Sequence, residues 1–281
     1  MMHEQFILSN QVSIPSIGFG TWQAPNGEVA ISSVKYAIES GYTHIDTAAI
    51  YGNEKSIGQA IKESGVTREK LFITSKVWNS DRGYESTKKA FHNTLSDLQL
   101  EYLDLYLIHW PANSKQFDNW QSINAETWRA LEDLYKAGKI KAIGVSNFMV
   151  KHLQTLLKTA EIRPMVNQIE FHPGHRQAEV VELCQQNNIL IEAWSPLGTG
   201  KMLTNPTLVA IAAKYGKSVA QLCVRWCLQN GTLPLPKSVT PSRIDENKVV
   251  FDFEISVEDM QTINQMPYCG GSGLDPDLVD F

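Results

Sequence analysis

The sequence predicts an α/β protein of the (β/α)8 class, a TIM barrel with an N-terminal β-hairpin and a short C-terminal tail. Three observations lead to this prediction. Short apolar or β-branched runs alternate with helical patterns along the 281 residues, as in parallel βαβ units. Eight such runs can be counted, which is the strand number of a closed barrel of this length. No Pro/Gly/Ser-rich linker interrupts the order, so we predict a single domain over residues 1–281.

The predicted strands follow a small hairpin over "FILSNQVSI", residues 6–14. Each strand is a short run rich in apolar or β-branched residues. The second, "YTHIDTA", enters a turn directly after Asp46. The eight runs are 16–22, 42–48, 71–76, 103–110, 140–147, 165–172, 189–198 and 232–238.

The segments between the strands have the 3.6-residue apolar spacing of helices. In residues 53–64, for example, Ile57, Ala60 and Ile61 lie on one side. The helix after the eighth strand begins with Thr240, a good N-cap, and Pro241, a good first helical residue. The predicted helices are 28–40, 53–64, 84–98, 125–137, 149–158, 176–187, 206–215, 217–229 and 241–248.

An open Rossmann-type sheet is the alternative to the barrel. Against it, "GFGTWQ" at residues 18–23 lacks the third glycine of the dinucleotide-binding fingerprint and does not open a helix directly. A nucleotide, if bound, must be held in another way.

Composition excludes several classes of function. The net charge of −5 gives no basic footprint for nucleic acid, and no run approaches the ~18 apolar residues of a membrane span. Without a signal-peptide pattern, we expect a soluble, cytoplasmic protein. No dimer stripe is visible, so we expect a monomer.

Neither the cysteines nor the histidines indicate a metal site. Cys184, Cys223, Cys227 and Cys269 are scattered, and we interpret them as reduced thiols. The pair in "HPGH", residues 172–175, has no further cluster of ligands nearby. We therefore predict no metal.

Polar residues stand at the ends of the predicted strands, where a barrel places its active site. Singly, each has an ordinary structural explanation as a cap, a packed aromatic or a solvated strand end. A structural explanation for all of these residues together is weak, because it would place several charged side chains in one buried region, and burying unpaired charges is costly. In chain order they are Thr21, Trp22, Asp46, Tyr51, Lys76, His109, Ser146, Asn147, Gln168, Trp194, Ser195, Lys237 and Ser238.

Among these residues we predict an ion pair between Asp46 and Lys76, beside Tyr51. A tyrosine has a pKa of about 10, and a neighbouring ammonium group lowers it. Tyr51 could then donate a proton to an oxygen that gains negative charge, while His109 orients that oxygen by hydrogen bonding.

The sequence resembles the aldo-keto reductase superfamily from the hairpin to the C-terminus. The matching stretches are "GFGTW", "HIDTAAIYGNE", "ITSKVW", "DLYLIHWP", "GKIKAIGVSNF", "VNQIEFHP", "WSPLG" and "LPKSVTPSRIDEN". It is most similar to the bacterial and protozoal branch with 2,5-diketo-gluconate reductases and prostaglandin F synthase-like enzymes. The resemblance implies a barrel that reduces aldehydes and ketones with NADPH, with Asp46, Tyr51, Lys76 and His109 as catalytic tetrad and Tyr51 as proton donor.

The resemblance also implies a cofactor site. Ser146, Asn147 and Gln168 match positions that bind the nicotinamide carboxamide, and Trp194 matches a ring that stacks on the nicotinamide. The start of the last predicted helix can receive phosphate. There Lys237, Ser238 and Arg243 match positions for the 2′-phosphate, and Glu246 and Asn247 positions near the adenine, so we predict a preference for NADPH over NADH. Gly20, Thr21, Trp22, Asp46, Ser195, Pro196, Leu197 and Val239 complete the predicted cofactor site.

Three tryptophans follow strands, and the resemblance implies that they line the substrate pocket with Tyr51 and His109. They are Trp22, Trp78 and Trp110, and aromatic walls suit an apolar substrate or the flat face of a sugar carbonyl. Because the tail "YCGGSGLDPDLVDF" is short and rich in glycine, we expect an open pocket. Small aldehydes, dicarbonyls and keto-sugars are the predicted substrates.

Two other functions are open. Barrels of this superfamily also serve as cofactor-binding, redox-sensing subunits of channels, but a complete tetrad favours turnover. A barrel aldolase or isomerase would use Lys76 as a Schiff base. Asp46 should keep Lys76 charged, which disfavours that role.

Overall fold

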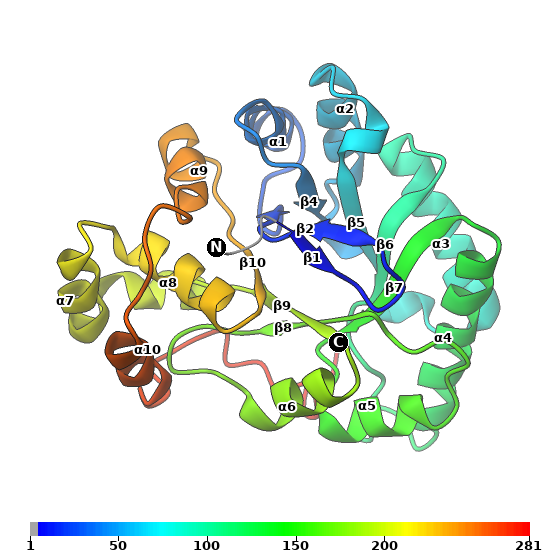
Figure 1. The fold of residues 1–281 in the computed structure, drawn as a ribbon. Helices are drawn as coiled ribbons and strands as arrows, with labels where there is room; N and C mark the ends of the chain where they lie inside the picture. The colour runs from blue at the N-terminus through cyan, green and yellow to red at the C-terminus, as the bar shows by residue number, and fades with distance from the viewer. Residues whose placement is uncertain (1–4) are drawn as a thin grey trace.

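The computed structural model describes residues 5–281 and has the predicted (β/α)8 architecture (Figure 1). Each strand pairs in parallel with the next one along the chain, in the order β3 to β10. Two backbone bonds close the ring between its first and last strands: Gly18 N donates to Pro234 O at 3.1 Å and Gly20 N to Pro236 O at 3.0 Å. The strands are Phe19–Gly20 (β3), His44–Asp46 (β4), Phe72–Val77 (β5), Leu103–Ile108 (β6), Ile140–Ser146 (β7), Val166–Glu170 (β8), Leu190–Trp194 (β9) and Leu233–Leu235 (β10).

Helices surround the strands, as Figure 1 shows along the barrel, and bury their apolar faces against them. Among residues 5–281, no helix is both long and apolar enough to cross a membrane. The helices are Glu28–Glu39 (α1), Glu54–Glu63 (α2), Tyr84–Leu98 (α3), Trp120–Lys136 (α4), Val150–Leu157 (α5), Ala178–Gln186 (α6), Pro206–Lys214 (α7), Val219–Gln229 (α8), Pro241–Lys248 (α9) and Val257–Asn264 (α10).

Two helices differ from the predicted set. Helix α4 begins at Trp120, five residues before the predicted start, because Asn124 bonds the backbone of Ala112 in the preceding loop through both its amide atoms. Helix α10 was not predicted. Its first turn is capped by the Ser256 hydroxyl, which accepts from Asp259 N at 3.1 Å, while Ile263 is buried in the core.

The strands are buried on both faces, which explains their continuous apolar runs. Asp104 on β6 is a buried exception. Its carboxylate pairs with Arg68 at 2.6 Å and Lys141 at 3.0 Å, and it accepts from Ile73 N at 2.9 Å. This compensated charge is a structural feature of the strand, remote from the strand's carboxyl end.

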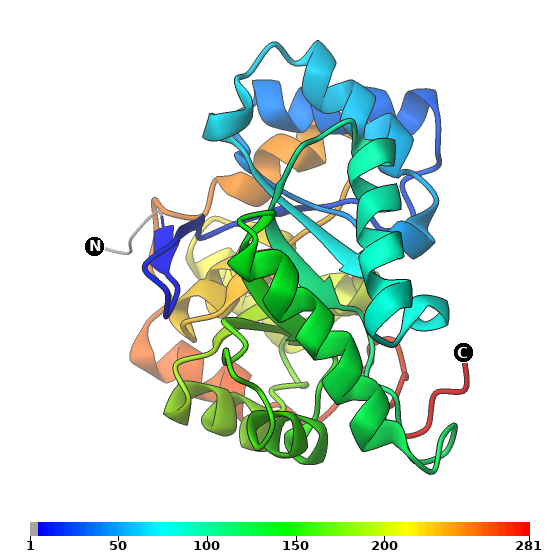
Figure 2. The ribbon, with the colours of Figure 1, turned by 90° about the vertical axis from the view of Figure 1, so that its right-hand side faces the viewer.

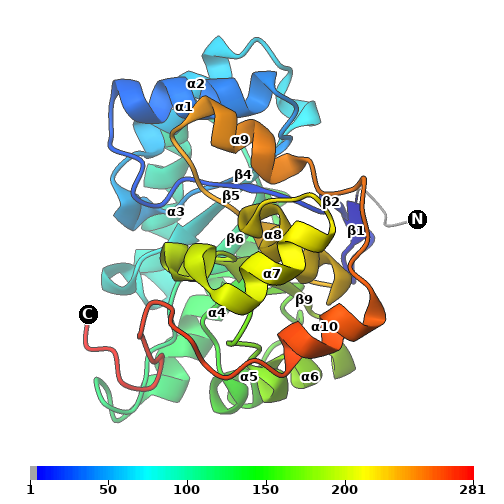
Figure 3. The same ribbon diagram turned by 90° about the vertical axis from the view of Figure 1, so that its left-hand side faces the viewer.

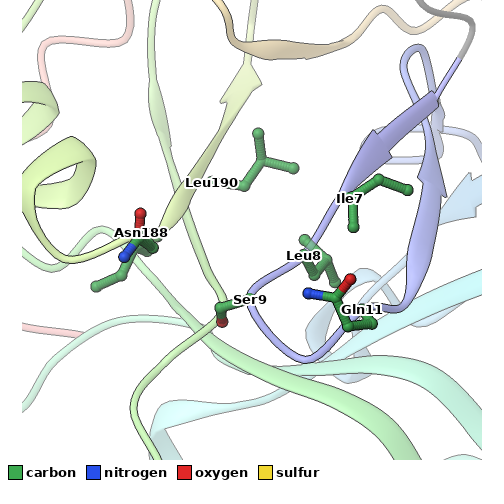
Figure 4. Close-up of a pocket in the computed structure, with 7 residues that line it drawn as sticks. Ile7, Leu8, Ser9, Gln11, Asn188 and Leu190 are labelled. Atoms are coloured by element: carbon green, nitrogen blue, oxygen red, sulfur yellow. The ribbon is translucent and has the colours of Figure 1, made fainter.

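The predicted hairpin consists of β1 (Gln5–Ile7) and β2 (Ser13–Pro15). Figures 2 and 3 show it at one end of the barrel and the C-terminal tail at the other. A hollow lies between the hairpin, at Ile7, Leu8 and Gln11, and the start of β9 at Asn188 and Leu190 (Figure 4). Because this hollow is at the amino end of β9, it lies away from the strand ends that carry the predicted chemistry.

Candidate active site

Three of the four predicted tetrad side chains meet at the carboxyl ends of β4 and β5. Lys76 Nζ donates to Asp46 Oδ1 at 2.7 Å and to Thr47 O at 2.9 Å, and it lies 3.4 Å from the Tyr51 hydroxyl. Lys76 is fully buried and Asp46 is almost so. The predicted ion pair beside Tyr51 is therefore present.

The chain reaches Tyr51 through a tight turn after β4. A single 3-10 turn, Ala49–Tyr51, ends at Gly52, whose φ of 66° is a left-handed conformation that favours glycine. Buried Asn53 then ties this turn to the loop after β3, since its amide donates to Thr21 O at 3.0 Å and Ala24 O at 3.1 Å. The Tyr51 hydroxyl is thereby held over Lys76.

The expected direction of the Tyr51 pKa is wrong. Burial raises the pKa of Tyr51 above 10.0, and Lys76 opposes this effect without overcoming it. For Lys76 itself, burial lowers the pKa, but Asp46 and Tyr51 outweigh burial and leave it above its ordinary value. The site therefore holds a protonated phenol beside a charged ammonium group, an arrangement suited to giving a proton away.

His109 follows β6 and packs edge-on against two aromatic rings. Its ring centroid lies 5.6 Å from that of Tyr51 and 5.1 Å from that of Trp78. Burial, and then the charge of Lys76, hold the His109 pKa well below its ordinary value. A neutral imidazole can donate one hydrogen bond to an oxygen near Tyr51.

The residues predicted to bind the nicotinamide end are connected by hydrogen bonds across three strand ends. Asn147, at a left-handed φ of 62°, donates to His109 O at 2.9 Å and accepts from the indole N–H of Trp194 at 2.8 Å. The Ser146 hydroxyl donates to Gln168 O at 2.8 Å. Trp194 is thus oriented beside the tetrad by the same amide that contacts His109.

The residues predicted to bind the 2′-phosphate and adenine lie at β10 and α9. Helix α9 begins at Pro241 as predicted, but the Thr240 side chain makes no capping bond; instead the Ser238 hydroxyl accepts from Thr240 N at 3.0 Å. Lys237 Nζ donates to Gln23 O at 3.0 Å, and Arg243 is exposed. Asn247 is buried on the same helix, and Glu246 and Val239 are at least partly exposed.

The remaining predicted cofactor residues lie in the loops after β3 and β9. The Thr21 hydroxyl donates to Asp46 O at 2.9 Å, and Gly20 pairs in register with Asp46. Ser195, at a φ of 49°, turns the chain after Trp194 and accepts from Gly198 N at 2.8 Å. Of the two residues after it, Pro196 is buried and Leu197 half-buried.

The C-terminal tail covers part of the predicted substrate pocket, so the expectation of an open pocket is wrong on this side. The ring of Phe281 stacks on Trp78 with centroids 5.7 Å apart and packs edge-on against Trp110 at 5.4 Å. Asn79 Nδ2 donates to Phe281 O at 2.9 Å and fixes the tail there. Trp22, by contrast, is 45% exposed.

Two residues of the site were missed at the level of sequence. Nothing in the sequence around Phe281, apart from its aromatic side chain, indicates that it belongs to the substrate pocket. Glu192 could have been found, because it is a charged residue inside the apolar run "ILIEA" and lies on the same side of its strand as Trp194, two residues later. It accepts a hydrogen bond from Gln168, whose amide also donates to Asp46.

Comparisons with known proteins agree with this geometry. The aldo/keto reductase family model matches residues 16–267. A glyoxal reductase of Bacillus subtilis is 55% identical over 98% of this chain and 96% of its own, and a 9,11-endoperoxide prostaglandin H2 reductase of Trypanosoma cruzi is 49% identical over 96% and 94%. A Bombyx mori aldo-keto reductase solved in complex with NADP superposes with a TM-score of 0.85 at 36% identity, over 94% of this chain and 93% of that one.

These relatives confirm the predicted family and its bacterial and protozoal branch. The match spans nearly all of the barrel, including every strand that carries a tetrad side chain. The chain belongs to the aldo/keto reductase family.

Proposed function

We propose that this protein reduces small aldehydes, dicarbonyls and keto-sugars to alcohols with NADPH, with Tyr51 as the proton donor. One observation carries the proposal: the Tyr51 hydroxyl lies 3.4 Å from a buried ammonium group that Asp46 holds in place. The glyoxal reductase among its relatives supports the dicarbonyl class, and the solved complex with NADP supports the cofactor.

Several atoms of the described residues are free to hold the cofactor. The side-chain amide oxygen, Oε1, of Gln168 accepts no hydrogen bond from residues 5–281, and neither Thr240 nor another described residue bonds the Ser242 N–H in the first turn of α9. An amide acceptor suits a carboxamide, and an uncapped helix start beside Lys237 and Arg243 suits a phosphate. Trp194 would offer a flat face to the nicotinamide ring.

When bound, NADPH supplies the hydride that reduces the carbonyl carbon. Tyr51 gives its proton to the carbonyl oxygen as that oxygen gains negative charge, and the charge of Lys76 stabilises the phenolate that remains. His109, being neutral, donates a hydrogen bond to the same oxygen. Asp46 keeps Lys76 charged and fixed.

The strands that carry the proposed site residues are distributed around the whole barrel. We therefore also propose that residues 1–281 act as one domain.

The test is the loss of NADPH absorbance with methylglyoxal, a nitrobenzaldehyde and a diketo-sugar acid as substrates. Turnover of all three is expected, since aromatic walls accept both flat and small carbonyl compounds. Turnover of none, with NADPH bound, would leave a cofactor-binding barrel without reductase activity. A steroid or prostaglandin preferred by orders of magnitude would contradict the substrate class.

Replacing Lys237 with Met is expected to weaken NADPH binding about tenfold and to leave NADH binding unchanged. A lysine that meets a phosphate makes a charge-assisted hydrogen bond, and NADH lacks the 2′-phosphate. Dissociation constants for both cofactors, measured by quenching of tryptophan fluorescence, check this. Lys62→Met, at an exposed position on α2, removes the same charge elsewhere and serves as control. Equal weakening of both cofactors would show that Lys237 does not contact the 2′-phosphate.

Replacing Phe281 with Ala is expected to raise kcat/KM for a naphthaldehyde about three- to tenfold relative to methylglyoxal. The ring fills space between Trp78 and Trp110, so its removal leaves room for a larger apolar group. Leu278→Ala, at a 61% exposed position of the same tail, is the control. An unchanged ratio would mean that Phe281 lies outside the path of the substrate.

A further inference from the structure

Glu192 lies inside the barrel and has no part in the chemistry proposed above. Its side chain is fully buried on β9. Its Oε2 accepts a hydrogen bond from Gln168 Nε2 at 2.8 Å. Its Oε1 lies 3.9 Å from His44 Nε2 and has no hydrogen-bond partner among the described residues. A buried carboxyl with one unpartnered oxygen is costly, so its place in the barrel calls for a compensating role.

The Gln168 amide shows what that role is. Its nitrogen carries two protons, and both are used, one toward Glu192 Oε2 and one toward Asp46 Oδ2 at 2.9 Å. In the opposite orientation the amide oxygen would face the Asp46 carboxylate, which has no proton to donate. The two acid side chains therefore fix the amide with its nitrogen toward the barrel interior and its oxygen free to accept.

We propose that Glu192 is a positioning residue of the cofactor site: with Asp46 it locks the Gln168 amide so that its carbonyl oxygen accepts from the amine of the nicotinamide carboxamide. The inference rests on the proposed function, in which Gln168 meets that carboxamide. It differs from the role of Asp46, because Glu192 makes no hydrogen bond or ion pair with Lys76 and its one side-chain hydrogen bond among residues 5–281 is to Gln168.

The charge state of Glu192 fits this role. Burial, and then the negative charge of Asp46, raise the pKa of Glu192 to about 8. At neutral pH the carboxyl is therefore uncharged and accepts through one oxygen while its proton sits on the other. Gln168 is anchored without placing a second negative charge beside the Asp46–Lys76 pair. A glutamine at position 192 would offer the same acceptor.

The test compares NADPH with its acetylpyridine analogue, in which a methyl group replaces the amine of the carboxamide. Binding without substrate is measured by quenching of tryptophan fluorescence. Glu192→Met, similar in length but without an acceptor, is expected to weaken NADPH binding about five- to tenfold and to change binding of the analogue by less than about twofold. Glu192→Gln is expected to keep NADPH affinity within about twofold of wild type.

A second buried carboxyl provides the matched control. Glu54 on α2 accepts from the Ser75 hydroxyl at 2.6 Å and does not contact Gln168. Glu54→Met should therefore leave the ratio of the two affinities unchanged. If Glu192→Met does not fold by circular dichroism, Glu192→Ala is compared with the same two cofactors.

Three other results of these binding measurements would overturn the proposal for Glu192. Equal weakening of NADPH and the analogue would show a merely structural role and overturn the proposal, as would unchanged NADPH binding. Loss of NADPH affinity in Glu192→Gln would also overturn it, because the acceptor is still present. If wild-type protein binds neither cofactor, the proposed function itself fails, and that failure is visible before any variant is made.

Discussion

Tyr51→Phe is expected to lower kcat for methylglyoxal about 10²- to 10⁴-fold, the usual contribution of a positioned general acid. The variant loses only the hydroxyl that lies 3.4 Å from Lys76 Nζ. The buried pair of Lys76 and Asp46 does not depend on that hydroxyl, because Lys76 also donates to Asp46 and Thr47. The dissociation constant for NADPH should therefore stay close to the wild-type value. A fall in kcat with unchanged NADPH binding would show that the variant has lost the proton donor and kept an intact cofactor site.

Tyr106→Phe is the matched control for this experiment. Tyr106 is a fully buried tyrosine on β6 that packs against Phe91 on α3, away from the tetrad. Its hydroxyl has no hydrogen-bond partner among the described residues, so its removal should leave kcat unchanged. A Tyr51→Phe variant that keeps more than about a tenth of wild-type kcat would show that another group gives the proton.

Lys76→Met should reduce kcat at least as strongly as Tyr51→Phe. Without the ammonium, the phenolate left by proton transfer would be buried beside Asp46 with no compensating charge. The variant also leaves the Asp46 carboxylate buried without its cation, so a loss of stability is expected with it. The fall in kcat should be measured at a temperature where circular dichroism shows the variant folded. Retained turnover there would contradict the role of Lys76.

The fold could be predicted because its strands are continuous apolar runs in a regular order. Because barrels form their active sites at the carboxyl ends of the strands, the sequence alone also predicted that Asp46, Lys76 and His109 lie close together. Helix α10 escaped prediction because only one or two of its residues reach the core, so its polar sequence resembles a loop. Local patterns identify elements that bury a full face, and they fail for elements that bury little.

The missed parts of the site depend on contacts between distant segments. Phe281 reaches Trp78 only because the tail crosses the mouth of the barrel, some 200 residues along the chain from the ring it covers. Glu192 meets Gln168 through the register of β8 and β9. The direction of the Tyr51 pKa was wrong for a related reason: the effect of Lys76 follows from the sequence, whereas the larger effect of burial depends on the packed site.

Glu192→Gln is expected to remove a loss of stability that the wild-type protein suffers as the pH rises. The folded-state pKa of Glu192 is about 8 against an ordinary value of 4.5, so between these values the folded protein holds a proton that the unfolded chain releases. Unfolding then releases a proton and becomes easier as the pH increases. By pH 8 the accumulated cost is on the order of 4 kcal/mol, which a neutral glutamine does not incur.

The cleanest window for this measurement is pH 6.5 to 8. His44, beside Glu192, has a folded-state pKa of about 3 against an ordinary 6.5, so it is neutral in the folded protein throughout this window. Its titration in the unfolded chain is shared by all the compared proteins and cancels in the difference between them. Across this window the free energy of unfolding, from urea titrations, should fall by roughly 1 to 2 kcal/mol in the wild type relative to Glu192→Gln.

A second buried carboxyl serves as the control for this measurement. It tests whether replacing any buried glutamate with glutamine changes the pH dependence of the free energy of unfolding. Glu54 has a folded-state pKa of about 6, so its own loss of stability occurs between pH 4.5 and 6 and is nearly complete below the window. Glu54→Gln should therefore follow the wild-type slope from pH 6.5 to 8, and only Glu192→Gln should flatten it. Parallel slopes in all three proteins would mean that Glu192 is already ionised at neutral pH, and that Gln168 is then held between two carboxylates.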